Sequence, residues 1–377
     1  MDVKDQLQAA LESAVERGEH GVQVAAYVGD ELVLDGWIGD ADESGTPVDG
    51  TTLFPIFSVT KGLTCTAVHI QAERGLVDYD EPVATYWPEF GAEGKGDIKV
   101  GDILAHQSGV PQMPEGTTPE RLGDWDWCVE NLAALKPLLP VGSSAYASLS
   151  FGWQAGEIVR RTDPQGRDFR TFVYDEILDP LKIDDYHLGL PEEHYGRVAQ
   201  LRAPGALRPD PPRLRTVSMP APVEPGPRWN QPVFMSAVVP AGSGIANARS
   251  VAKLFSLLAN KGTLEGNKIL SEDRVMSFLT PRSSSGQYDD VIGQVPWVGV
   301  GGYWLSGESP PADSVLGGRP GMLASNGAGG SIAWADPETG LSVAICHNRM
   351  FSINPSPPPE EHPFTAVSDL ARSLVRS

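Results

Sequence analysis

Long apolar runs are missing from this sequence of 377 residues. A helix that crosses a membrane needs about 18 or more consecutive apolar residues, and no segment reaches that length. The opening residues, Met-Asp-Val-Lys-Asp-Gln, also lack the basic stretch, the apolar stretch and the small-residue cleavage site of an export signal. We therefore expect a cytoplasmic protein with no membrane partner.

Cysteine and positive charge are both scarce. The three cysteines, Cys65, Cys128 and Cys346, are odd in number and far apart, which indicates reduced thiols in the core rather than a disulfide framework. Lys and Arg number 29 against 49 Asp and Glu, so the formal net charge is −20. Such a surface repels nucleic acid and anionic membranes, and we expect no nucleic-acid partner.

Several signatures of other enzyme classes are absent as well. The seven histidines are scattered and no His-Glu-x-x-His occurs, so we expect no metal. The Gly-x-Ser-x-Gly elbow of α/β-hydrolases is missing. Gly327 to Gly330 is not a phosphate loop, because no Gly-Lys-Ser/Thr and no helix pattern follow it. We expect no cofactor.

The composition, with 41% hydrophobic and 21% charged residues, is that of an ordinary globular protein. Apolar periodicity predicts helices at both ends of the chain and strands close to them. The expected helices are 3–17, a segment after residue 58 that ends at Gly75, 250–260 and 364–375. The expected strands are 22–28 and 32–38, joined by a hairpin turn at 29–30, and 297–303, 331–335 and 341–346.

Residues 78–235 show mostly helical patterns. The sequence thus predicts an α+β fold in which residues 1–77 and 236–377 form a sheet domain and residues 78–235 form an inserted, mainly helical lobe. Within that insert, residues 203–231 contain eight prolines. We interpret them as a long ordered loop rather than an interdomain linker, because neither flanking segment looks able to fold alone.

Ser58-Val-Thr-Lys61 follows an apolar strand-like run and begins a helical pattern. Residues three apart share a helix face, so the Lys61 amine lies beside the Ser58 hydroxyl and can activate it as a nucleophile. A helix N-terminus favours the alkoxide, and burial would lower the pKa of Lys61 toward that of a useful base.

The same spacing recurs at Ser250-Val-Ala-Lys253. Chance alone produces about one or two such matches in a chain of this length. Here Ser250 opens an amphipathic helix, so we interpret it as an N-cap and Lys253 as a solvated surface residue.

Two further segments carry groups that such a nucleophile needs. Tyr146, in Pro140-Val-Gly-Ser-Ser-Ala-Tyr146-Ala-Ser148, precedes a helical pattern; by itself it could be a core anchor. Ser325-Asn-Gly-Ala-Gly-Gly-Ser331 precedes a strand. A peptide N–H there can join that of Ser58 in an oxyanion hole, although the segment could equally be the rim of a hairpin.

In this order, the elements resemble the β-lactamase-like serine hydrolases, which comprise class C β-lactamases, family VIII carboxylesterases, and D-stereospecific peptidases and amidases. The resemblance covers most of the chain. It is carried by Phe57-Ser58-Val-Thr-Lys61, Leu104-Ala-His106-Gln-Ser-Gly109, Tyr146-Ala-Ser148, Asn247-Ala-Arg249, Asn326-Gly-Ala-Gly-Gly-Ser331 and Asn348-Arg-Met350.

The resemblance implies a mixed, largely antiparallel sheet flanked by helices, with the active site between the sheet and the helical lobe. It implies that Ser58 is acylated, that Lys61 and Tyr146 move protons, and that the N–H groups of Ser58 and Ala328 bind the oxyanion. Ser148 stands where the family often has Asn, and Ser325 where it has Lys, His or Trp. Both departures bear on substrate binding, together with the neighbouring Asn326 and Gly327.

We expect the substrate pocket to be lined by aromatic residues, which would favour apolar acyl or alcohol groups. The expected function is hydrolysis of small carboxylic esters. Amide, weak β-lactam or D-peptide hydrolysis on the same scaffold is the alternative within the class, and a catalytically inert binding or scaffold protein is the alternative from another class. The aromatic candidates are Trp125, Trp127, Trp229, Tyr303 and Trp304.

Two serine variants separate the two Ser-x-x-Lys matches. Ser58→Ala should abolish ester turnover and leave the fold intact. Ser250→Ala should leave turnover unchanged and reduce the free energy of unfolding by at most about 0.5–2 kcal/mol, as the loss of a helix cap. Both are measured with a chromogenic short-chain ester and thermal unfolding, and turnover of Ser58→Ala within a few fold of the wild type would refute the assignment.

Overall fold

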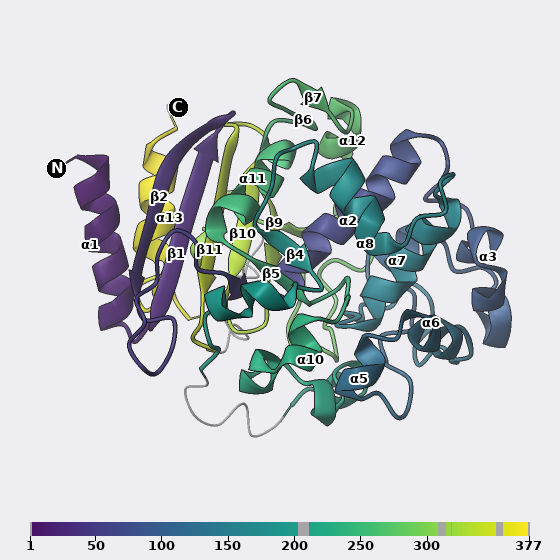
Figure 1. Cartoon of the computed structure of the whole chain (residues 1–377). Coiled ribbons are helices and arrows are strands. Elements are labelled where there is room, and N and C mark those ends of the chain that lie inside the picture. The colour runs from purple at the N-terminus through teal and green to yellow at the C-terminus, as the bar shows by residue number, and fades with distance from the viewer. Residues whose placement is uncertain (1, 203–210, 308–313, 318, 352–356, 376–377) are drawn as a thin grey trace.

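A six-stranded sheet forms one side of the computed structural model, which describes residues 2–202, 211–307, 314–317, 319–351 and 357–375 (Figure 1). The strand order is β2-β1-β11-β10-β9-β8, and each neighbouring pair is antiparallel. The strands are β1 (Gly21–Val28), β2 (Glu31–Gly39), β8 (Trp304–Leu305), β9 (Leu323–Asn326), β10 (Ile332–Asp336) and β11 (Leu341–His347).

Helices cover both faces of this sheet. On one face lie α1 (Val3–Glu16) and α13 (Thr365–Ser373), the first and last helices, and α11 (Ala248–Ala259) lies on the other (Figure 1). Since both faces are covered, β1 and β11 are buried along almost their whole length. The strands predicted at 22–28, 32–38, 331–335 and 341–346 are thereby confirmed, as are the helices predicted at 3–17, 250–260 and 364–375.

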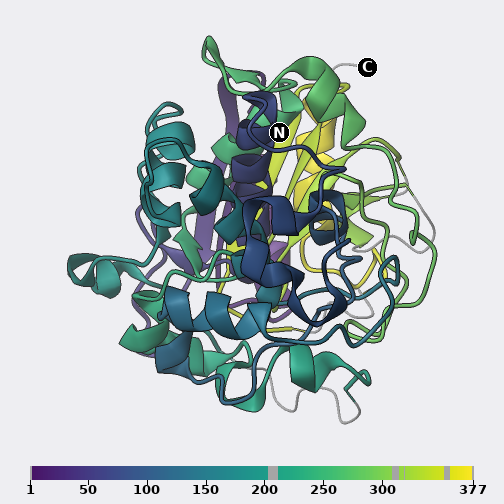
Figure 2. The same cartoon turned by 90° about the vertical axis from the view of Figure 1, so that its right-hand side faces the viewer.

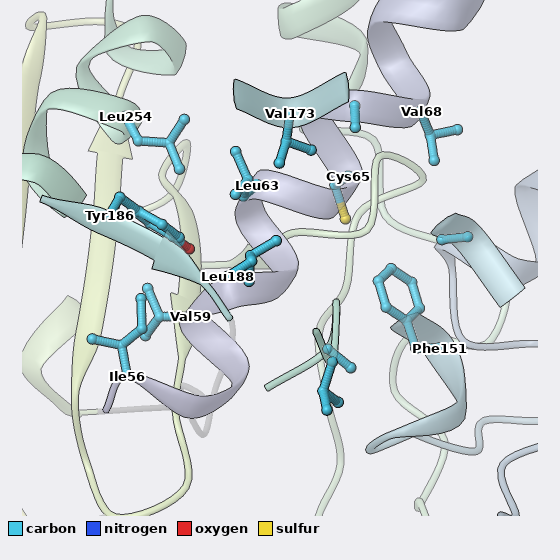
Figure 3. Packing of buried hydrophobic residues seen from close by; sticks show 14 of the residues in the cluster. Ile56, Val59, Leu63, Cys65, Val68, Phe151, Val173, Tyr186, Leu188 and Leu254 are labelled. Carbon is cyan, nitrogen blue, oxygen red and sulfur yellow. The ribbon is translucent and has the colours of Figure 1, made fainter. Parts of the chain in front are cut away.

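The helix α2 (Thr60–Glu73) runs through the centre of the molecule, and all its residues except the last are buried. Its apolar side chains pack on one side against Leu254 of α11 and on the other against Phe151 and Val173 (Figure 3). Figure 3 also shows Tyr186 and Leu188 of β4 (Tyr186–Leu188) against this helix.

Most helices between residues 80 and 180 lie on the far side of α2 from the sheet in Figure 1, and Figure 2 views the molecule from their side, with the strands behind. The apolar residues of these helices belong to the same hydrophobic cluster as α2, α11 and one face of the sheet. The division into a sheet domain and a helical lobe stays a prediction, and the two parts share one core. The helices before residue 200 are α3 (Val83–Tyr86), α4 (Val100–Leu104), α5 (Pro119–Leu122), α6 (Trp125–Ala133), α7 (Ser150–Thr162) and α8 (Phe169–Val173).

Short elements complete the fold. A three-stranded sheet has the order β3-β5-β4, with β3 (Phe54–Pro55) and β5 (Gly244–Ala246), and β6 (Thr263–Leu264) pairs with β7 (Asn267–Lys268). The helices α9 (Arg215–Ser218), α10 (Pro232–Met235) and α12 (Glu272–Ser277) lie in connecting segments. In the described part of the chain, no helix is both long and apolar enough to cross a membrane.

The structure describes only part of the proline-rich segment 203–231. Residues 203–210 lie outside the described residues, whereas residues 211–231 follow a defined path with α9 and two 3₁₀ turns.

The prediction of a strand at 297–303 is wrong. Only isolated bridges occur there, at Val298 and Gly299, and the regular strand β8 begins at Trp304. A Cβ on Gly299 would lie 2.0 Å from the carbonyl oxygen of Phe278, and Gly302 has φ +87°. Gly299 and Gly301 lie against Phe278 and Gly302 turns the chain, where the apolar pattern suggested an extended run.

The interpretation of Ser250 as an N-cap is also wrong. Asn247 caps α11, because its Oδ1 accepts the Ser250 N–H at 2.9 Å. Ser250 is the third residue of the helix and is buried, and Lys253 pairs with Glu265 at 2.8 Å instead of being free in solvent.

Substitution of Asn247, and not of Ser250, should therefore remove the stabilisation that the helix cap provides. Asn247→Ala removes the capping bond and the bond from Nδ2 to Asp185, so it should lower the free energy of unfolding by about 1–2 kcal/mol. Ser250→Ala, with the cap intact, should cost less than Asn247→Ala. Denaturant unfolding of both variants checks the order, and the reverse order would contradict it.

Candidate active site

The segment that carries Ser58 is pinned between two strands. β3 pairs with β5, and the Ile56 N–H continues the ladder by donating to the Gly244 carbonyl at 2.9 Å. Ser58 then lies in a 3₁₀ turn, Phe57–Val59, directly before α2. Since the N–H of Ser58 belongs to the first turn, it has no partner within the helix and remains available to a ligand.

Phe57 reaches this turn with φ +45°, a left-handed conformation that is uncommon for a bulky side chain. Its ring packs edge-on against Trp229, with centroids 5.3 Å apart. Strain of this kind persists where the surroundings enforce it and often marks a functional turn. Nothing in the sequence indicates this strain, because a positive φ at a non-glycine residue leaves no pattern.

The Lys61 amine is buried and surrounded by oxygen atoms. Its Nζ lies 3.0 Å from Ser58 Oγ, 2.7 Å from the Ser148 carbonyl oxygen and 3.0 Å from the Ala241 carbonyl oxygen. Burial lowers the pKa of Lys61 from 10.5 to about 7, because the charged form loses its hydration. Near neutral pH, a large fraction of Lys61 is therefore uncharged.

The two carbonyls decide how neutral Lys61 is oriented. A carbonyl oxygen only accepts hydrogen bonds, so the two N–H groups of the neutral amine are directed to Ser148 and Ala241. The lone pair then remains for the third neighbour, Ser58 Oγ. This arrangement lets Lys61 accept the Ser58 proton without any rotation.

Tyr146 is buried beside the Lys61 amine. Lys61 Nζ is 4.9 Å from the centre of its ring. Burial raises the pKa of Tyr146 above its usual value, and hydrogen bonding with the side chains of Ser58 and Trp304 opposes the rise only in part. The phenol thus stays protonated at neutral pH and can donate a proton.

The turn between β9 and β10 approaches the nucleophile closely. Ser325 Oγ donates to the carbonyl of Ser58 at 2.9 Å, and a Cβ on Gly327 would lie 2.3 Å from the Ile56 carbonyl oxygen. Only glycine fits at position 327. Within the described residues, the N–H groups of Ser58 and Ala328 donate to no protein acceptor, as an oxyanion hole requires.

The structure therefore brings together Ser58, Lys61, Tyr146, Ser148 and Ser325. Their catalytic and binding roles stay predictions. The sequence did not suggest that the Ser325 hydroxyl binds the carbonyl of Ser58 and so holds the Ser58 turn. Ser148 contributes its carbonyl to Lys61, while its buried hydroxyl has no hydrogen-bond partner among the described residues. Asn326 is the last residue of β9 and is buried.

The five aromatic candidates lie in different surroundings. Trp229 contacts Phe57, and the ring of Trp304 lies 5.7 Å from that of Tyr146, so both border the site. Tyr303 is a core residue whose hydroxyl meets Thr66 Oγ1 at 3.0 Å.

The other two candidates have partners on the helical side. Trp125 donates to Glu157 at 2.8 Å and stacks on Phe169. Trp127 packs against Arg121.

His106 is a site neighbour to which the sequence assigned no role. Its buried ring lies 4.4 Å from the ring of Tyr146, and its Nδ1 accepts the Ala147 N–H at 3.2 Å. Burial holds the pKa of His106 well below 6.5, so the ring is neutral. Its segment, Leu104 to Gly109, contributed to the family resemblance, but no local pattern indicated contact with Tyr146.

Metal ligands do not gather in the described residues, where no group of three or more His, Cys, Asp or Glu side chains could hold an ion. The polar groups around Ser58 are an amine, hydroxyls and backbone N–H groups. These groups suit nucleophilic acyl transfer.

The chain belongs to the Beta-lactamase family, whose sequence profile matches residues 5–361. The resemblance found from the motifs is thereby confirmed, together with the β-lactamase-like fold. A relative from Mycobacterium tuberculosis, called esterase/beta-lactamase LipL, is 34% identical over 348 residues, which make up 88% of this chain and 78% of that protein.

Two solved structures resemble the whole chain. A family VIII carboxylesterase is 29% identical with a TM-score of 0.87, and the match covers 99% of this chain and 98% of that one. A penicillin-binding protein homologue from Caulobacter crescentus is 29% identical with a TM-score of 0.84, covering 97% and 98%.

The low pKa of Lys61 predicts the pH dependence of ester hydrolysis. Only the neutral amine accepts a proton, so kcat/KM should rise about tenfold per pH unit below about pH 7 and level off above it. His106 and Tyr146 do not change protonation in this range, because burial lowers the one pKa and raises the other. Initial rates on a neutral ester between about pH 5 and about pH 8 test this; a flat profile would exclude Lys61 as the base.

Proposed function

We propose that the protein is a carboxylesterase-type serine hydrolase that cleaves small carboxylic esters through an acyl-enzyme on Ser58. The observation that carries the proposal is the 3.0 Å contact between Lys61 Nζ and Ser58 Oγ, with the other two acceptors around Nζ being carbonyls. The sequence similarity to an esterase/beta-lactamase and to a family VIII carboxylesterase supports an ester as the substrate.

In the acylation step, neutral Lys61 takes the proton of Ser58 Oγ while this oxygen attacks the ester carbonyl carbon. The developing oxyanion accepts hydrogen bonds from the N–H groups of Ser58 and Ala328. As the tetrahedral intermediate collapses, the C–O bond to the alcohol breaks, and Tyr146 donates its proton to the leaving oxygen. The proton on Lys61 then restores the phenol, so the proton count balances.

Deacylation runs through the same groups in reverse roles. A water molecule takes the place of the alcohol, gives its proton through Tyr146 to Lys61, and attacks the acyl carbonyl carbon. Collapse of the second intermediate returns the proton to Ser58 Oγ and releases the carboxylic acid.

The site also favours neutral substrates. Ser325, in the position where the β-lactamases carry a cation, donates its hydrogen bond to the Ser58 carbonyl. Two other cations suggested by the motifs are occupied elsewhere: Arg249 pairs with Asp35 at 3.1 Å, and Arg349 donates to Glu19 at 3.3 Å. In a protein of net charge −20, neither Ser325 nor these two paired arginines offers an attraction to a carboxylate.

A cytoplasmic location is part of the same proposal. Cys65, Cys128 and Cys346 are all unpaired and buried, which suits a reducing compartment. The acidic composition likewise supports a small-molecule substrate over nucleic acid.

Acyl-enzyme formation and substrate charge test the proposal together. Intact mass after brief incubation with a neutral p-nitrophenyl ester should show the mass of one acyl group on the wild type and none on Ser58→Ala. Acylation of Ser58→Ala would overturn the choice of nucleophile.

For the second half of the test, kcat/KM is compared between that ester and an anionic chromogenic cephalosporin. A buried contact to a charged group is worth about 1.5–3 kcal/mol, so lacking it should disfavour the cephalosporin by roughly 10- to 100-fold. Comparable values for both substrates would mean that another cation serves the carboxylate.

A further inference from the structure

The loop that carries Tyr146 is held by a residue far away in the sequence. Asp289 is completely buried, and its Oδ2 accepts the Tyr146 N–H at 2.8 Å and the Ser144 hydroxyl at 3.1 Å. Its other oxygen accepts the N–H groups of Val291 and Ile292, at 2.9 and 3.3 Å. Asp289 thus fixes its own turn with one oxygen and the Tyr146 backbone with the other.

A buried cation completes this connection. Arg282 donates to Ser144 Oγ at 2.5 Å, so Ser144 accepts from the guanidinium and donates to Asp289. Arg282 also donates to the carbonyl of Ala105. Buried charges are costly unless hydrogen bonds compensate them, and here Arg282 and Asp289 share Ser144, which lies two residues before Tyr146.

His106 holds the same loop from its other side. The His106 carbonyl accepts the Ala145 N–H at 3.2 Å, and its Nδ1 accepts the Ala147 N–H at 3.2 Å. Residues 144 to 147 are therefore each fixed by a hydrogen bond to a buried partner. The backbone of Tyr146 cannot shift unless one of these bonds breaks.

We infer that Asp289 is a positioning residue of the active site: together with Arg282 and Ser144, it fixes the backbone of Tyr146 so that the phenol stays beside Ser58 and Lys61. The inference rests on the proposed function, in which Tyr146 donates the proton that the leaving alcohol needs. The hydrogen bond of Asp289 to Tyr146 goes to the main chain, and among the described residues its carboxylate forms none with Ser58 or Lys61.

The leaving group of the ester separates this role from general stabilisation of the fold. An alkoxide leaves only when it is protonated, so hydrolysis of an ethyl ester depends on a well-placed Tyr146. A p-nitrophenolate leaves without protonation. Misplacing the phenol should therefore slow the ethyl ester far more than the nitrophenyl ester of the same acid.

The test uses Asp289→Asn, with kcat/KM measured on ethyl butyrate and p-nitrophenyl butyrate. The asparagine has the same shape but only one acceptor oxygen, so it cannot serve both the Tyr146 and the Val291 sides. We expect a loss of roughly 10- to 100-fold on the ethyl ester and at most a few fold on the nitrophenyl ester. Tyr146→Phe should show the same substrate pattern, more strongly.

Two control variants isolate the cause. Asp290→Asn removes the adjacent, partly exposed carboxylate, which pairs with Arg213, and should leave both rates unchanged. Val367→Ala destabilises the buried side of α13, far from Tyr146 in the sequence, and should leave the ratio of the two rates unchanged at equal folded fraction. Ser144→Ala breaks the Arg282–Asp289 connection and replaces Asp289→Asn if that variant does not fold; it should give a smaller loss with the same preference.

Equal losses on both esters, or none, in folded Asp289→Asn or Ser144→Ala would overturn the positioning role. The proposed function has its own test, because Ser58→Ala must be inactive on both esters. If Ser58→Ala is inactive while Asp289→Asn shows equal losses, only the positioning role is rejected. If Ser58→Ala keeps its activity, the function itself is rejected.

Discussion

The burial of the Lys61 amine is the constraint on which the rest of the structure depends. The amine is useful as a base because the interior removes its hydration and lowers its pKa to about 7. That burial has a cost: the folded chain binds this proton less tightly than the unfolded chain does. The destabilisation is full below about pH 7 and declines as the pH rises toward 10.5, the ordinary value.

Contacts of the central helix α2 offset part of this loss of stability. It is surrounded by protein over nearly its whole length, and its polar side chains find partners there. Thr64 donates to the Pro240 carbonyl at 2.6 Å and Gln71 to Thr162 at 3.0 Å. Gly62 leaves room for Phe255, whose ring a Cβ would meet at 2.9 Å. These contacts compensate part of the cost of burying the polar groups of the helix.

Around this helix, the site is assembled by close approach of backbone to backbone. The β9–β10 turn reaches the Ser58 turn because residue 327 has no side chain, and Ser325 links the two through the Ser58 carbonyl. On the opposite side, Asp289, Arg282 and His106 hold the Tyr146 loop by its main chain. Three segments from distant parts of the sequence thus meet around one amine, which explains how a few polar groups can be held in a fixed geometry.

The sequence by itself determined what is local. Ser58 and Lys61 are three residues apart on one helix, so their proximity follows from helical geometry, and the alternating and periodic runs at both chain ends predicted the main sheet and its covering helices. It failed where tertiary contacts override local pattern: the glycines at 299–302 turn against Phe278, and Asn247 caps the helix that Ser250 was expected to cap. Only the tertiary structure decided that Ser325 binds the Ser58 carbonyl and that Asp289 holds Tyr146. It likewise decided that Trp229 and Trp304 border the site while Tyr303 lies in the core. The hydrogen bond from Tyr146 to Asp289 spans 143 positions of the sequence, and the one from Ser325 to Ser58 spans 267. No periodicity in a sequence encodes which distant side chains the packed core brings together.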